Sequence, residues 1–213
     1  MNLFLQLIEF AGVAVFAVSG ALAAGRKSLD LLGVIVIAMV TATGGGTVRD
    51  LLLDRTVFWI ARPEFLVVIF GAALLTIPYV RYSRPPEKFL QVADALGLAL
   101  FSIAGTRIAL SLDAGGLIAV VMGTITGAFG GVLRDVLCNE IPMILRKGQI
   151  YATAAIVGCS LLVVLDRFDI VANVANAAGA ATIALLRLAA IAFDLSLPVF
   201  SLPAARERER DEP

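Results

Sequence analysis

Residues 41–50 read Thr-Ala-Thr-Gly-Gly-Gly-Thr-Val-Arg-Asp, and residues 126–135 read Thr-Gly-Ala-Phe-Gly-Gly-Val-Leu-Arg-Asp. Each stretch ends in an Arg-Asp pair that follows adjacent glycines inside a long apolar segment. Residues 9–52 align with residues 94–137 without a gap, and 13 of the 44 aligned positions are identical. Apolar composition alone does not produce matching Arg-Asp pairs behind matching glycines, so the alignment indicates an internal repeat. The constant shift of this alignment, which takes Glu9 to Asp94, is called the repeat offset below.

The composition around these stretches is that of a membrane protein. Hydrophobic residues make up 60% of the 213 residues and charged residues only 16%, with a net charge of zero; the mean hydropathy is +0.94. Charged residues make up roughly a quarter of a typical soluble domain. A soluble fold of this size would expose much of its apolar surface to water, so lipid is the expected solvent.

Seven apolar stretches are compatible with transmembrane helices of about 20 residues. They cover residues 3–24, 31–53, 64–80, 89–110, 116–138, 149–165 and 170–193. The first stretch has no basic residue before it, so we interpret it as a span and not as a signal peptide. The sequence predicts an all-α integral membrane protein with one membrane domain over residues 1–201. Residues 203–213 alternate in charge and are expected to form a disordered tail.

Each copy of the repeat contains three spans. Repeat 1 covers about residues 3–83, repeat 2 covers about residues 88–166, and a seventh helix at about 168–193 has no counterpart. Because three is an odd number, the second copy must enter the membrane upside down relative to the first. Such inverted repeats are common in transporters, where the pathway lies between the repeats near the midplane.

The basic residues of the loops predict the orientation. If the N-terminus is outside, ten Lys and Arg residues lie in the inside segments and four lie outside. The ten are Arg26, Lys27, Arg81, Arg84, Lys88, Arg146, Lys147, Arg206, Arg208 and Arg210; the four are Arg55, Arg62, Arg107 and Arg167. Positive residues concentrate on the cytoplasmic side, so we predict the N-terminus outside and the C-terminus inside.

The adjacent glycines allow two interpretations. Glycine weakens a helix by roughly 1 kcal/mol relative to alanine, so a run of glycines permits a kink or an unwound turn that faces a wet interior. The glycines concerned are Gly44, Gly45, Gly46, Gly130 and Gly131. The alternative is close helix packing, since small residues recur at four-residue spacing in both spans. These residues are Ala38, Ala42 and Gly46 in one span and Gly123, Gly127 and Gly131 in the other.

Arg49, Asp50, Arg134 and Asp135 are charged residues about 18 to 20 positions into their spans. Sequence neighbours do not share a helix face, so we expect each arginine to pair with a group other than its own aspartate, either across the repeats or at freed carbonyls. Ionisable residues at depth are functional candidates, and the alternative is an interfacial pair that reaches toward the lipid headgroups.

Further polar residues lie on the same spans. Glu9 and Asp94 occupy matching places, either as charges at the pathway mouths or as carboxylates favoured near helix N-termini. Thr41, Thr43 and Thr126 either line a passage or bond back to their own helices. Arg187 in the last span faces either a neighbouring subunit or the passage.

Other residue types exclude several function classes. The chain has no histidine, and its two cysteines make no disulfide framework. Without a nucleophile and base or a cluster of metal ligands, we expect no enzyme activity, no metal and no cofactor. The zero net charge gives no reason to expect nucleic acid as a partner.

With its repeat and paired glycine motifs, the chain resembles the bacterial branch of the trimeric intracellular cation channel (TRIC) family over about residues 5–192. Phe129 departs from the motif, because it stands where a third glycine would lie. The resemblance implies a homotrimer in the bacterial plasma membrane, in contact with lipid, whose protomers each conduct monovalent cations such as K⁺ or Na⁺ through a pore kinked at the glycines. The same bacterial group resembles one described as a glycine-transporter domain, so a carrier for glycine or another small zwitterion is the alternative.

Overall fold

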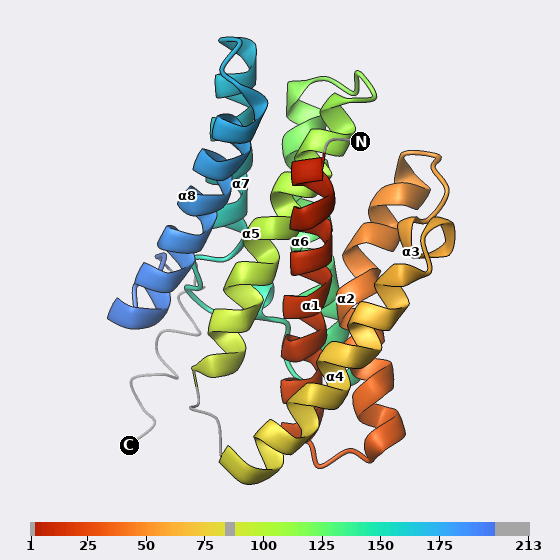
Figure 1. The fold of residues 1–213 in the computed structure, drawn as a ribbon. Helices are drawn as coiled ribbons and strands as arrows, with labels where there is room; N and C mark the ends of the chain where they lie inside the picture. Colours follow the sequence, from red (N-terminus) through yellow and green to blue (C-terminus); the bar gives the residue numbers. More distant parts are fainter. Residues whose placement is uncertain (1–2, 84–87, 199–213) are drawn as a thin grey trace.

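The computed structural model describes residues 3–83 and 88–198, which are mainly α-helical (Figure 1). The described helices follow one another in the order α1 (Leu3–Arg26), α2 (Leu31–Leu52), α3 (Phe58–Ala61), α4 (Glu64–Ser83), α5 (Phe89–Leu110), α6 (Gly116–Leu137), η1 (Met143–Leu145), α7 (Ala152–Arg167) and α8 (Ala172–Phe193).

A helix overlies each of the seven predicted spans, and the all-α prediction is confirmed. Five helices of the described segments, α1, α2, α5, α6 and α8, are long and apolar enough to cross a membrane. The apolar part of α4, Glu64–Val80, is shorter, and α7 has 16 residues. The short helices α3 and η1 were not predicted. The predicted tail at 203–213 lies outside the described residues.

The helices end at residues that tolerate a left-handed backbone. Short polar residues adopt this conformation more readily than others because their side chains bond locally. Ser28 and Asp113 follow α1 and α5 with φ of 55° and 53°, and Asp54 and Asn139 follow α2 and α6 with φ of 50° and 54°. The members of each pair are separated by the repeat offset, so the repeat includes the loops as well as the spans.

The helices α1, α2, α5 and α6 pack against one another at the centre. Helix α4 packs on α1 and α2, α7 packs on α5 and α6, and α8 packs on α5 and α7. In Figure 1, α1 descends from the N-terminal end while α5 ascends, and α2 ascends while α6 descends. Helices in matching places of the two halves therefore run in opposite directions.

The two halves meet at a pair of matched aromatic residues. Phe16 and Phe101 stack with ring centroids 5.3 Å apart. A Cβ atom on Gly12 would lie 2.9 Å from the Phe101 ring, and one on Gly97 would lie 2.4 Å from the Phe16 ring. Each ring thus fits over the glycine of the opposite half, because no side chain intervenes.

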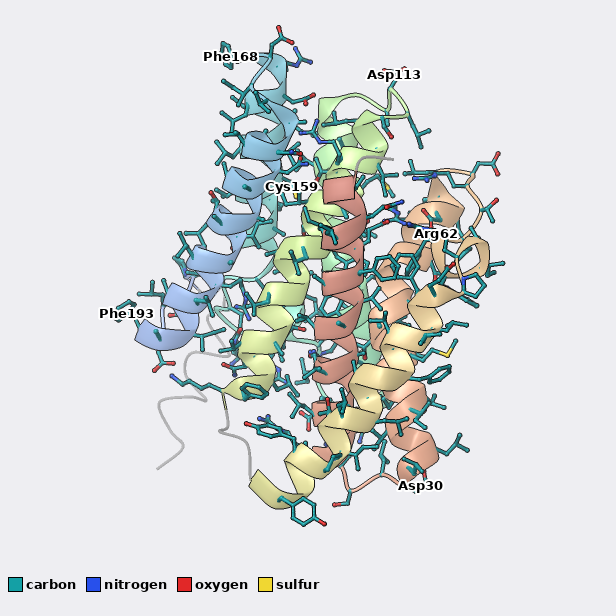
Figure 2. The ribbon with its side chains drawn as sticks, in the orientation of Figure 1. Asp30, Arg62, Asp113, Cys159, Phe168 and Phe193 are labelled. Atoms are coloured by element: carbon teal, nitrogen blue, oxygen red, sulfur yellow. The ribbon has the colours of Figure 1, made fainter. Side chains whose placement is uncertain are left out.

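Large apolar side chains cover the outside of the bundle (Figure 2). Val67 and Leu75 on α4 and Leu117 on α6 are 73%, 76% and 79% exposed. Exposed apolar side chains of this size are costly in water and suit lipid. At one end of the molecule, Lys27 forms an ion pair with Glu140 at 2.5 Å, and this bond lowers the pKa of Glu140.

Candidate functional site

The glycine motifs of α2 and α6 meet where the two helices cross. A Cβ atom on Gly45 would lie 2.0 Å from the carbonyl oxygen of Thr126, and one on Gly130 would lie 2.3 Å from that of Thr41. Real Cβ atoms essentially never approach within 3.0 Å of another heavy atom. The backbones are therefore in direct contact, as small residues permit between membrane helices.

The predicted unwinding at the glycines is wrong for this structure. Helix α2 continues through Gly44, Gly45 and Gly46, and α6 continues through Gly130 and Gly131. The reason is the close crossing itself, since it needs glycines on two intact helices and uses their missing side chains for packing. The packing interpretation therefore explains these glycines, and a bend at the glycines stays a prediction.

The threonines of the crossing bond back to their own helices. The hydroxyls of Thr41, Thr43 and Thr126 donate to the carbonyls of residues four positions earlier, Ile37, Met39 and Met122, at 2.6, 2.8 and 2.6 Å. Thr41 and Thr126 are fully buried. Their hydroxyls are thus satisfied within the helix, which is the common arrangement for such residues.

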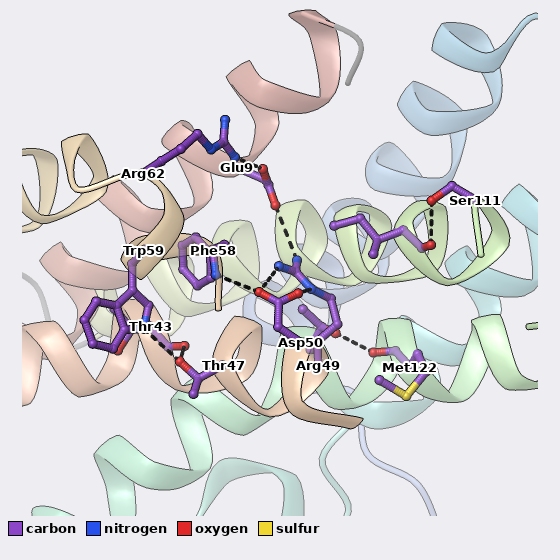
Figure 3. Close-up of polar contacts among 12 residues, drawn as sticks. Glu9, Thr43, Thr47, Arg49, Asp50, Phe58, Trp59, Arg62, Ser111 and Met122 are labelled. Atoms are coloured by element: carbon purple, nitrogen blue, oxygen red, sulfur yellow. Dashed lines mark hydrogen bonds and ion pairs between the residues drawn. The ribbon is translucent and has the colours of Figure 1, made fainter. Parts of the chain in front are cut away.

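Arg49 is the centre of a buried charge cluster at one end of the crossing (Figure 3). Its guanidinium donates to Asp50 at 2.8 Å and 3.0 Å and to Glu9 on α1 at 3.4 Å. Arg62, just before α4, donates to the other oxygen of Glu9 at 2.8 Å. Asp50 also accepts the backbone N–H of Phe58 at 2.9 Å, which ties α3 to the end of α2.

Arg134 is the centre of the matching cluster in the second half. It donates to Asp135 at 2.8 Å and to Asp94 on α5 at 2.7 Å. It also reaches the Ser19 hydroxyl of α1 at 2.5 Å. Asp135 accepts the backbone N–H of Met143 at 2.9 Å, as Asp50 accepts that of Phe58. The contacts of the two clusters therefore match at the repeat offset, except that the first cluster adds a second arginine and the second adds a serine.

The pairing predicted for the arginines is confirmed only in part: each arginine does bind a group other than its own aspartate, but it also binds that aspartate. Each arginine binds the aspartate next to it and a carboxylate of its own half. Among the described contacts of the two clusters, the bond from Arg134 to Ser19 joins the two halves. A guanidinium carries five donors on a long stem, so it reaches a neighbouring residue that a short side chain could not. Asp50 and Asp135 lie in the last turn of their helices and also accept a backbone N–H from the segment that follows. These bonds hold each aspartate close to the arginine before it.

Glu9 and Asp94 do not lie at an open mouth. Their side chains are 2% and 0% exposed, and each is an ion-pair partner of a buried arginine. The prediction of mouth charges is therefore wrong for this structure. Carboxylates that are removed from water need a close cation, and Arg49 and Arg134 provide it.

The two clusters differ in charge balance. Arg62 and Arg49 together face two carboxylates, whereas Arg134 alone faces Asp94 and Asp135. The residue that matches Arg62 is the exposed Lys147. Within the described segments, one oxygen of the fully buried Asp94 has no hydrogen-bond partner. Among these ion pairs, the second cluster therefore has one cation in contact with two carboxylates, and Arg187 also interacts electrostatically with Asp94.

Sequence reasoning missed several residues of these clusters. Arg62 and Phe58 lie outside the aligned repeat, but the repeat offset relates them to Lys147 and Met143 and could have found them. No sequence signal pointed to Ser19 as a partner of Arg134. Over residues 3–83 and 88–198 no group of three or more Cys, Asp or Glu residues is placed to hold a metal ion.

Comparison with known proteins places these features in a family. A family model described as "Glycine transporter" matches residues 6–80 and 91–167. The UPF0126 inner membrane protein YadS of Escherichia coli K12 is 48% identical over 198 residues, covering 92% of this chain and 95% of that protein. The solved TRIC channel orthologue of Rhodobacter sphaeroides is 40% identical with a TM-score of 0.87, covering 91% of this chain and all of that one.

The chain belongs to the bacterial TRIC family. A second solved structure, described as a TRIC cation channel, is 33% identical with a TM-score of 0.82 over 92% of this chain and 97% of that one. The two segments that the family model matches begin at residues 6 and 91, which are separated by the repeat offset. A TRIC protein is a multi-pass membrane protein and not an enzyme.

Proposed function

We propose that this TRIC protein is a channel for monovalent cations, K⁺ or Na⁺, with a separate pathway in each protomer of a homotrimer. The observation that carries the proposal is the likeness to the Rhodobacter sphaeroides TRIC cation channel orthologue, at 40% identity over nearly the whole of both chains. The plasma membrane is the proposed location, because the Escherichia coli relative is described as an inner membrane protein.

The proposed architecture is seven spans, made of two inverted repeats of three spans each and α8 as the seventh. The opposite directions of α1 and α5, and of α2 and α6, support the inversion (Figure 1). The two arginine clusters support it residue by residue, since their contacts recur at the repeat offset. In inverted repeats the pathway lies at the interface of the halves, which is the crossing of α2 and α6.

We infer that ions pass where Gly45 and Gly130 bring the two helices into contact. The contact closes the pathway in the described arrangement, so conduction requires α2 and α6 to bend or part at the glycines. Arg49 and Arg134 hold the ends of these helices in place. The unpaired oxygen of buried Asp94 supports selection of cations over anions, because a buried carboxylate oxygen attracts cations and repels anions.

The conduction proposal predicts single-channel currents. Purified protein in a planar bilayer under a KCl gradient is expected to show unitary, ohmic steps that reverse close to the K⁺ equilibrium potential. A bilayer that received detergent alone is the control. Silence over many fusions of monodisperse protein, or reversal at the Cl⁻ potential, would contradict the proposal.

The second candidate function is a carrier for glycine, which the description of the matching family model favours. Helix ends and an arginine can hold a carboxylate in such a carrier. Proteoliposomes loaded with radiolabelled glycine distinguish the two functions. Saturable glycine exchange without unitary currents favours the carrier, and currents without exchange favour the channel.

The proposed orientation predicts the labelling of two loops. In a background with Cys138 and Cys159 replaced by alanine, Leu112→Cys in the α5–α6 loop is expected to react with an impermeant maleimide in intact spheroplasts. Leu29→Cys in the α1–α2 loop should react only after permeabilisation, because the inverted second half places equivalent loops on opposite sides. Both leucines are exposed, at 46% and 41%, so the reagent can reach them. Labelling of both from one side would contradict the inversion.

A further inference from the structure

The glycine motifs of the two halves have different neighbours beside the crossing of α2 and α6. A Cβ atom on Gly46 would lie 2.5 Å from the Phe58 ring, so the first half covers this glycine with an aromatic side chain. A Cβ atom on the matching Gly131 would lie 3.0 Å from both the Asp94 carboxylate and the Tyr151 hydroxyl. The second half therefore places polar groups one residue away from the point where the two backbones touch.

Arg187 on α8 lies against this polar group of residues. It is 1% exposed and rests on the Tyr151 ring, with 4.7 Å between its Cζ atom and the ring centroid. One guanidinium nitrogen, Nη1, donates to the Ile150 carbonyl at 3.0 Å and to the Gln149 amide oxygen at 3.4 Å. These contacts fix the guanidinium on the tyrosine whose hydroxyl reaches Gly131.

Arg187 and Asp94 both have unused hydrogen-bonding atoms. Within residues 3–83 and 88–198, Nε and Nη2 of Arg187 and Oδ2 of Asp94 are buried and have no hydrogen-bond partner. A buried charge is costly unless an opposite charge lies close to it. Asp94 interacts electrostatically with Arg187 and with Tyr151, which contacts the guanidinium. Each of the two buried charges therefore offsets the other through the protein interior.

The first cluster has a second arginine as well, but from a different part of the chain. Arg62 donates to Glu9 at 2.8 Å, and Arg49 contacts the same carboxylate at 3.4 Å. In the second cluster one arginine contacts both carboxylates, and Arg187 acts on one of them by electrostatic interaction. Helix α8 lies outside the repeat. It therefore supplies a charge to the second half that the loop before α4 supplies to the first.

We propose that Arg187 lowers the affinity of the pathway for cations by balancing the charge of Asp94 beside the α2–α6 crossing. It acts through Asp94 and does not touch the ion, so it is a positioning residue. At an effective dielectric constant of about 20, a unit charge about 10 Å from a cation changes its binding roughly tenfold. The inference rests on the proposed cation conduction and makes α8 part of the conducting unit.

Thermal unfolding of the full chain in detergent tests the charge pairing without any current. Arg187→Gln is expected to lower the midpoint by roughly 5–15 °C, because Asp94 loses a buried counter-charge. In an Asp94→Asn background the same substitution should cost less than about half as much, since the carboxylate is gone. Glu9→Gln is the matched background, because Glu9 occupies the equivalent place and has its own arginines. Equal costs of Arg187→Gln in the three backgrounds would overturn the pairing.

Single-channel recording at stepped K⁺ concentrations tests the effect on the pathway. Arg187→Gln is expected to lower the half-saturating K⁺ concentration roughly three- to tenfold, and Arg187→Lys should recover most of the wild-type value because lysine keeps the charge. Asp94→Asn should raise this concentration by a similar factor, so it decides the matter if Arg187→Gln does not fold. Arg55→Gln removes an exposed arginine as the control.

The recordings separate a failure of this inference from a failure of the proposed function. Wild-type currents whose half-saturating concentration is unchanged in Arg187→Gln and Asp94→Asn overturn the inference and leave the conduction standing. An equal shift in Arg187→Lys and Arg187→Gln also overturns it, because charge would then not be the cause. A silent wild type overturns the conduction and, with it, this role of Arg187.

Discussion

Gly45→Ala is expected to lower the thermal midpoint by roughly 2–12 °C and to abolish cation flux. The new Cβ atom would meet the Thr126 carbonyl oxygen at 2.0 Å, and backbone of an intact helix cannot move aside cheaply. Overpacking of this kind costs about 1–3 kcal/mol, and roughly 2–4 °C corresponds to each kcal/mol at this chain length. Gly130→Ala should behave alike, because its Cβ atom would lie 2.3 Å from the Thr41 carbonyl.

The matched control is Gly71→Ala, whose Cβ atom would meet nothing within 4 Å. Alanine favours a helix over glycine by about 1 kcal/mol, so the control should be neutral or stabilised. Thermal unfolding followed by size-exclusion fluorescence measures stability, and K⁺ flux from proteoliposomes measures conduction. Larger Gly45→Leu and Gly130→Leu variants should abolish flux while some protein stays folded. Wild-type stability and flux in both alanine variants would show that the crossing is not tightly packed.

Arg134→Met is expected to destabilise the protein most, by about 3–5 kcal/mol or roughly 6–20 °C. It would leave Asp94 and Asp135 buried without the cation that contacts them at 2.7 Å and 2.8 Å. Arg49→Met should cost less, because Glu9 keeps its 2.8 Å contact with Arg62. The difference in destabilisation between Arg134→Met and Arg49→Met therefore measures the unequal charge balance of the two clusters.

The same unfolding assay tests this prediction, with Arg55→Met as a control for loss of an exposed arginine. Adding Asp94→Asn to Arg134→Met should recover part of the loss, since it removes one of the stranded charges. A double-mutant cycle then gives the coupling of Arg134 with Asp94. Equal midpoints for Arg134→Met and the wild type would refute the buried ion pair.

Sequence reasoning predicted the helices better than their contacts. The apolar stretches located α1, α2, α5, α6 and α8 to within a few residues, because the spacing of polar breaks reflects the bilayer thickness. It also identified the glycines and the Arg-Asp pairs as the important residues. It did not predict that Arg49 and Arg134 also bind the aspartates next to them, since a rule about helix faces ignores how far a guanidinium reaches.

The sequence by itself determined that the chain is a helical membrane protein with an internal repeat, because hydropathy and identity at a fixed offset need no coordinates. Tertiary structure alone decided that the glycines serve a close crossing, that Glu9 and Asp94 are buried, and that Arg187 has an unused edge. These properties depend on distances between segments far apart in the chain, and such distances leave no trace in residue spacing.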